Sequence, residues 1–299
     1  VTLNGATNLV TLGGDIQTNA SSAATAGTLS LTASALDLSA DSSITTDGTT
    51  TDQAINLGSI PVTSSSSSAL TLNSGSEAIT LSSVGSASDT LGNLIVSSSG
   101  SVDLDGNVEA TGVQILASGS AESIDFTGVS IDANGGNVFL SSDSITFGTA
   151  ISSTGSSGTT SATITGDTDA STITINSGAG SDANLEISET DLALIASDFS
   201  DVILGSSSAD GTIGLEAQAD QTGTITASAN DGTLNYNGYN LNLRGVASTT
   251  TITNPISSNG GQDNDLTIQG TAINLDANLN TDSGDVTLNG PVEINTGVT

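Results

Sequence analysis

Short apolar–x–apolar doublets recur along this chain at intervals of about 20 residues, and a period of this length limits the folds open to it. The doublet Val102–Leu104 recurs as Ile124–Phe126 and then as Ile145–Phe147. Near the end of the sequence, Leu266–Ile268 recurs as Val286–Leu288 in the same way. Alternate residues of a strand face the same side, so each doublet directs two side chains towards a core. The regular recurrence indicates a repeat architecture.

The intervals between doublets are filled with Gly, Asn, Asp and Ser, which form turns and leave no room for helices. The sequence therefore predicts an all-β fold, a right-handed parallel β-helix in which residues 1–299 form one continuous segment. At about 20 residues per coil the chain would make roughly 14–15 coils. An antiparallel sandwich is the rival, since some spacings also fit hairpins at intervals of about 8–12 residues.

The composition is poor in large side chains and very acidic. Aromatic residues make up 2% of the chain, and the hydrophobic fraction is 35%, so disorder is an alternative that the regular doublets oppose. The formal net charge is −31, with Arg244 as the one basic residue. A chain with one cation cannot neutralise a phosphate backbone, which excludes nucleic acid as a partner and disfavours anionic membranes. No apolar run is long enough for a membrane span.

The residue inventory also argues against an enzyme. The chain has no His, Cys or Trp, so the common acid–base and nucleophilic constellations cannot form. Glycoside hydrolysis can use two carboxylates alone, and Asp103/Asp105 and Asp167/Asp169 are such pairs. With 32 acidic residues, pairs of this kind arise by chance. We assign no catalytic residue, and a β-helical carbohydrate-active enzyme remains only as an alternative.

Calcium is the one inorganic ligand that the sequence suggests. Carboxylate and amide oxygens suit this hard cation, and "GGQDND" (260–265) resembles part of a Gly-rich calcium-binding repeat. The candidate ligands are Asp263 and Asp265, together with Asp167 and Asp169 in "TGDTDAS" (165–171). The competing interpretation is that these are turn residues solvated by water. No other cofactor is expected.

One stretch departs from the strand pattern. Leu192, Ile195 and Phe199 recur at helical spacing, and Ser188 with Asp191 resembles a capping box. We therefore expect one short helical turn near 189–198 whose apolar side lies against the coil.

This stretch and the strands that follow it resemble a known family. "ETDLALIASDFSDVILGSSSADGTIGL" (189–215) is similar to a recurring segment of filamentous-haemagglutinin-like large exoproteins, and "GDVTLNGPVEINTG" (284–297) resembles their strand repeats. The resemblance implies a right-handed β-helix in a very long secreted bacterial surface protein used in adhesion or matrix building. It implies an extracellular, cell-surface location and no catalytic residues.

A short polar segment contains both tyrosines of the chain. Tyr236 and Tyr239 in "LNYNGYNLNL" are three residues apart, so on one continuous strand they would face opposite sides, and they could form a contact patch. Neighbouring asparagines, including Asn240 and Asn242, predict stacked amide ladders. Arg244 is expected to pair with a nearby acid.

Three functions follow from these observations. The first is a non-enzymatic structural or adhesive rod of a large surface protein, with surface glycans or other cells as partners. The second is a self-assembling subunit of an extracellular filament or surface layer, with further copies of itself as end-to-end partners; the third is the enzyme. "VTLNG" occurs at 1–5 and again at 286–290, and the chain opens without Met, so we expect an interior piece of a continuing pattern. Unpaired strand edges at its ends would bind further coils.

Overall fold

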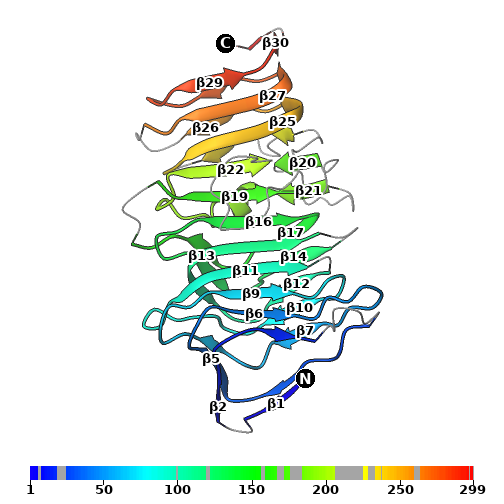
Figure 1. Cartoon of the computed structure of the whole chain (residues 1–299). Coiled ribbons are helices and arrows are strands. Elements are labelled where there is room, and N and C mark those ends of the chain that lie inside the picture. The colour runs from blue at the N-terminus through cyan, green and yellow to red at the C-terminus, as the bar shows by residue number, and fades with distance from the viewer. Residues whose placement is uncertain are drawn as a thin grey trace.

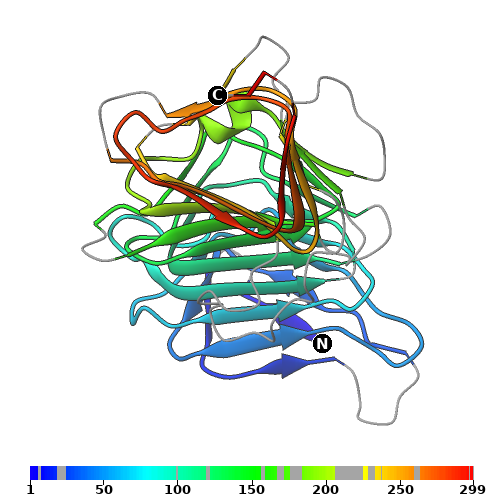
Figure 2. The same ribbon diagram turned by 90° about the horizontal axis from the view of Figure 1, so that it is seen from above.

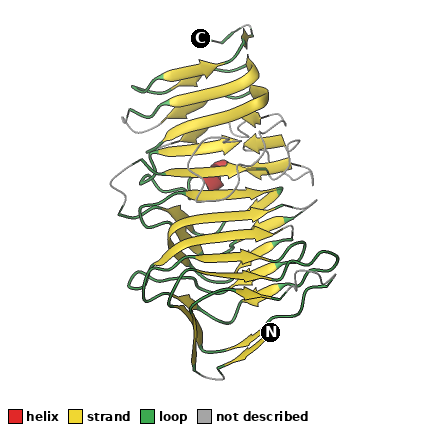
Figure 3. Cartoon of the chain, viewed as in Figure 1, coloured by secondary structure: helices red, strands yellow, loops and turns green. Residues whose placement is uncertain are grey.

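The structure is a computed structural model that describes residues 1–5, 8–18, 25–98, 100–118, 122–155, 159–166, 172–175, 184–205, 225–227, 233–236, 238–258, 263–295 and 297–298. Within these residues almost every regular element is a β-strand, and the single helix is α1 (Glu189–Leu192) (Figure 3). This distribution agrees with the all-β prediction.

The strands stack as the rungs of a β-solenoid that makes about nine turns. Every pairing between the described strands is parallel, and the rungs follow one another from the N-terminal to the C-terminal end (Figure 1). Seen from above, the last coils enclose a roughly triangular outline (Figure 2). The parallel β-helix is therefore confirmed, and the antiparallel sandwich is wrong.

Three stacks of strands contain most of the elements. The main sheet contains β3 (Ile16–Gln17), β6 (Ser42–Thr45), β9 (Leu70–Asn73), β11 (Leu91–Ser98), β13 (Val108–Ala117), β16 (Val138–Ser142), β19 (Ser161–Thr165), β22 (Asp201–Gly205), β25 (Asn240–Ile252), β27 (Leu266–Leu275) and β29 (Val286–Asn289). The second stack contains β2 (Leu9–Leu12), β5 (Ala35–Leu38), β8 (Val62–Thr63), β15 (Ser130–Asp132) and β18 (Ala150–Ser152). The third contains β7 (Ile55–Leu57), β10 (Ile79–Leu81), β12 (Val102–Leu104), β14 (Ser123–Asp125) and β17 (Ser144–Thr146). The other strands are β1 (Thr2–Asn4), β4 (Ser30–Thr32), β20 (Thr172–Ile175), β21 (Asn184–Ile187), β23 (Ile225–Ala227), β24 (Leu234–Tyr236), β26 (Ile256–Ser258), β28 (Leu279–Asn280) and β30 (Val292–Ile294).

The predicted number of 14–15 coils is wrong, because most coils are longer than the doublet spacing suggested. Along the main sheet, Val96 pairs with Ile115 at an interval close to the predicted one, whereas the next step, from Ile115 to Leu140, is longer. The step from Ile164 to Leu204 is longer still and spans the whole segment that contains α1. Turns and insertions between strands absorb these extra residues without changing the stacking of the strands themselves.

The predicted apolar ladder is present in the third stack. Val102 pairs with Ile124, and Ile124 pairs with Ile145, at the spacing that the sequence indicated. The predicted inward positions are buried, with side-chain exposures between 0% and 8%, for Val102, Leu104, Ile124, Phe126 and Ile145. Phe147 is partly buried, and its ring centroid lies 5.6 Å from that of Phe126. One connected apolar cluster contains these residues and runs through the described coils from Ile16 to Leu275.

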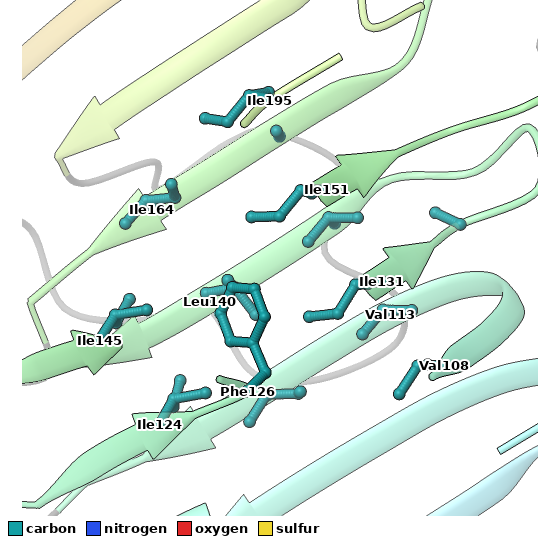
Figure 4. Close-up of a cluster of buried hydrophobic side chains, with 14 of the residues drawn as sticks. Val108, Val113, Ile124, Phe126, Ile131, Leu140, Ile145, Ile151, Ile164 and Ile195 are labelled. Carbon is teal, nitrogen blue, oxygen red and sulfur yellow. The ribbon is translucent and has the colours of Figure 1, made fainter. Parts of the chain in front are cut away.

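The short helix lies where a core position of the second stack has to be filled. Ile131 pairs with Ile151, and Ile151 forms a parallel bridge with Ile195, three residues after α1 ends (Figure 4). Ser188 is the N-cap of α1, and its hydroxyl accepts from the Asp191 N–H while the Asp191 carboxylate accepts from the Ser188 N–H. The capping box and the helical turn are thus confirmed, although the regular helix ends at Leu192. Leu192, Ile195 and Phe199 are all buried, as expected.

Candidate functional site

The structure places two of the four candidate calcium ligands. Asp263 is exposed ahead of β27, and Asp265 lies directly before the first residue of that strand. Asp167 and Asp169 lie outside the described residues. Among the residues that the structure describes, no group of three or more acidic, His or Cys side chains converges on one point. The calcium site remains a prediction.

Asp265 instead belongs to a row of side chains that link one coil to the next. Each member lies just before a strand or begins one, and its Oδ1 accepts the backbone N–H of the equivalent residue on the following coil. We call this row the Asx corner; it consists of Asp15, Asp41, Asn137, Asn240 and Asp265, whose donors are the N–H groups of Ser43, Ala69, Ser161, Asp265 and Asp285 at 2.8, 2.9, 2.9, 3.0 and 2.8 Å, respectively. In the second stack, Asn107 Oδ1 accepts the Ser130 N–H at 3.0 Å in the same way. These bonds satisfy backbone donors at a bend, where the strand ladder is interrupted.

Other carboxylates also bind backbone and hydroxyl groups of the next coil. Asp52 Oδ2 accepts from the N–H and the hydroxyl of Ser76 at 2.7 and 2.6 Å, and its Oδ1 accepts from the Gly48 N–H. The Ser76 hydroxyl, then the backbone N–H groups of Ser76 and Gly48, lower the pKa of Asp52 below its ordinary value. Part of the acidic composition therefore has a structural use in addition to solubility.

The carboxylate pair considered for glycoside hydrolysis lies on the outside of the rod. Asp103 and Asp105 are both exposed on one side of β12, and Asp103 is paired in register with Asp125 of the next coil. Burial, followed by the charges of Asp105 and Asp125, raises the pKa of Asp103. Desolvation, followed by the like charges of Asp105 beside it and Asp125 on the next rung, is an ordinary cause of such a shift in the pKa of a surface carboxylate.

The two tyrosines do not form an exposed patch, so this part of the sequence interpretation is wrong. Both are buried, with 1% of Tyr236 and 4% of Tyr239 exposed, and their ring centroids are 6.3 Å apart. The Tyr236 hydroxyl donates to the Asn264 carbonyl and the Tyr239 hydroxyl to the Leu192 carbonyl. Gly238 lies between them with φ of +86°, and this left-handed turn breaks the strand alternation that the prediction assumed.

The tyrosines line a cavity of about 480 Å³ beside α1, which we call the tyrosine pocket. Buried apolar groups form its floor, and more exposed polar groups lie at its rim. Its lining consists of Glu189, Leu192, Ala193, Ile195, Ala196, Ser197, Asn235, Tyr236 and Tyr239. Glu189 and Asn235 are 46 residues apart in sequence, and Glu189 Oε1 accepts from Asn235 Nδ2 at 2.9 Å. No local motif could have paired these residues, so the sequence interpretation missed the site.

A second cavity, of about 280 Å³, contains the sole basic residue of the chain. Its lining is polar and consists of Asn137, Thr159, Thr160, Ser161, Asp201, Ile203 and Arg244. Asp201 Oδ1 accepts from Asn240 Nδ2 at 3.3 Å and from Asn242 Nδ2 at 3.2 Å. These two asparagines therefore bind a carboxylate, and the predicted Asn-on-Asn ladder is wrong for them. The pairing of Arg244 with an acid stays a prediction.

Comparison of the chain with protein-family models, with curated proteins and with solved structures gave no match. In the described part of the chain, the one helix is too short to cross a lipid bilayer. The geometry of the fold and of the two cavities described above is therefore the basis for any assignment of function.

Proposed function

We propose that this chain is a non-enzymatic structural or adhesive rod, a segment of a large secreted bacterial surface protein. The observation that carries the proposal is the single apolar cluster that runs through the described coils from Ile16 to Leu275. A continuous core of stacked rungs makes an elongated body whose outer faces are available for contacts along its length. The resemblance of residues 189–215 to filamentous-haemagglutinin-like exoproteins supports the same role.

The surface of the chain suits an extracellular rod. Small polar side chains cover the outside of the strands, and the net charge of −31 keeps separate rods apart in solution. Surface glycans or other cells are the partners that we propose for these faces.

An antibody raised against residues 1–299 tests the proposal on cells that produce the protein. We expect it to label intact cells, and its Fab fragment to reduce their attachment to surfaces or to one another. An antibody against a cytoplasmic enzyme of the same cells is the control for membrane integrity. Labelling only after lysis would contradict the surface location, and labelling without any effect on attachment would leave the rod a purely structural role.

A specific observation also favours the second candidate, a self-assembling filament subunit. The large apolar side chains that are exposed in the described structure all lie in the terminal coils; they are Val1, Leu9, Val286, Val292 and Ile294. Each terminal coil can therefore receive another coil, which would bury these side chains and pair the open strand edge.

The repeated pentapeptide does not contribute to this second proposal. The first copy forms β1, which pairs with β4 in a two-stranded sheet, whereas the second forms β29 of the main sheet. The two copies thus occupy different positions around the coil. Light scattering of the purified chain tests end-to-end stacking, which Leu9→Ser and Ile294→Ser should weaken and the exposed Thr146→Ser should not. A monomer at all concentrations would refute it.

A further inference from the structure

The tyrosine pocket has the size and the layered polarity of a small-molecule site. Its volume of about 480 Å³ lies within the range of about 300–1,000 Å³ that such sites occupy. Leu192, Ile195 and Tyr239 supply a buried apolar floor, with 1–4% of each side chain exposed. Glu189 and Asn235 are half-buried at the rim. A ligand with an apolar body and one polar end matches this arrangement.

Hydrogen bonds hold the polar rim in place. Glu189 Oε1 accepts from the side-chain and backbone nitrogens of Asn235 at 2.9 and 3.4 Å, which ties α1 to β24. Within the described structure the other carboxylate oxygen of Glu189 has no hydrogen bond, so its negative charge can face a ligand cation. The Tyr236 and Tyr239 hydroxyls already donate hydrogen bonds to backbone carbonyls.

The charge of the pocket determines which kind of polar group the ligand should carry. The lining contains a carboxylate and no cationic side chain, and the whole chain carries a net charge of −31. An anionic ligand would be repelled, whereas a cation would be concentrated near the surface by the field of the protein.

We propose that the tyrosine pocket binds a small organic cation, an ammonium group attached to an apolar body. The ammonium lies at the rim beside Glu189, and the apolar part packs on Ala193, Ala196 and Tyr239. The site goes beyond the proposed rod function and does not depend on it, because binding can be measured on the purified chain whatever the location of the protein.

Choline is the probe, and its uncharged carbon isostere, in which a tert-butyl group replaces the trimethylammonium, is the matched ligand. Isothermal titration or ligand-detected NMR should show that wild-type protein binds choline up to about fivefold more tightly than the isostere. Added salt should weaken choline binding and leave the isostere unaffected.

Glu189→Gln removes the charge and keeps an oxygen that can accept from Asn235, so the fold should persist. We expect it to bring choline binding down to the level of the isostere. Glu293→Gln in β30, an exposed position far along the chain, makes the same change of net charge and should have no effect. Circular dichroism confirms that each variant is folded, and Tyr239→Phe should retain binding while Tyr239→Leu weakens it.

Several results would overturn the proposal. Equal binding of choline and its isostere would show that charge is not recognised, and equal losses in Glu189→Gln and Glu293→Gln would show only a general effect of net charge. If neither choline nor its isostere bound to the protein, the tyrosine pocket would not be a ligand site. None of these outcomes bears on whether antibody labels intact cells, so a failure here and a failure of the rod proposal are distinguishable.

Discussion

Replacing Ile124 by alanine should weaken the rod at one rung and leave distant coils intact. Ile124 has no exposed surface, and it lies between Val102 and Ile145 in the ladder of the third stack. The substitution removes three carbon atoms from the middle of this ladder. Both neighbours then face a cavity that their paired backbones cannot close.

The expected loss has two parts. Transfer of three methylene-sized groups contributes about 2.4 kcal/mol, at about 0.8 kcal/mol each. The cavity adds to this, and together they place the loss near 3–4 kcal/mol, within the range of about 2–5 kcal/mol for such truncations. Thr146→Ala is the control, because Thr146 is exposed in the adjacent strand β17, and it should change stability by less than about 0.5 kcal/mol.

The assay must report the stability of individual coils, since long arrays of coils need not unfold in one step. Hydrogen exchange with mass spectrometry should show faster exchange in β12, β14 and β17 and unchanged protection in β25 and β27. Urea titration followed by circular dichroism gives the size of the loss. A loss below about 1 kcal/mol, or a uniform loss of protection along the chain, would refute the stacking of Ile124 between these two neighbours.

Three further predictions concern polar groups. Asp265→Ala should cost about 0.5–1 kcal/mol in urea titrations, because the exposed Asp285 N–H exchanges its carboxylate acceptor for water. Asp265→Asn should recover much of this loss, and equal losses in the two variants would contradict the Asx corner. Because the pKa of Asp52 is lowered in the folded state, its ionised carboxylate stabilises the fold at pH values above the unfolded-state pKa of about 3.9. This stabilisation is lost as the pH falls through the folded-state pKa. Ser76→Ala should reduce this acid dependence, and an identical acid midpoint would refute it. Burial raises the pKa of Tyr236 to about 12, so stability should fall as the pH rises from about 10 towards 12, and Tyr236→Phe should flatten that fall in alkaline melting curves.

The doublets predicted the fold because they record which side chains stack. A pair such as Ile124 and Ile145 is readable from the sequence, since both strands contribute apolar residues at the same phase and are separated by one coil of about the predicted length. The capping box at Ser188 was readable for a similar reason, because all of its hydrogen bonds are local. The coil count was not, since the doublets do not record how many residues a turn or an insertion contains.

The sites were much less predictable than the core. The tyrosine pocket brings Glu189 against Asn235, which is 46 residues further along the chain, and its aromatic floor depends on the turn at Gly238. The sequence showed that Gly238 is there, but not that its φ is positive. Likewise, the carboxylate of Asp265 looked like a calcium ligand, and its contact with the Asp285 N–H depends on a register that only the folded coil fixes.

Both cavities lie where the regular repeat is interrupted, and there is a physical reason for this. Coils of equal length place equivalent residues directly above one another, which produces flat ladders with little concavity. The main-sheet steps from Ile164 to Leu204 and from Leu204 to Leu243 are both much longer than the doublet period, and these two steps frame both cavities. The added residues supply α1, whose turns leave the two-residue alternation and expose a carboxylate beside buried rings. The two cavities described above accompany long coils, so the coils around α1 are where ligand recognition should be sought first.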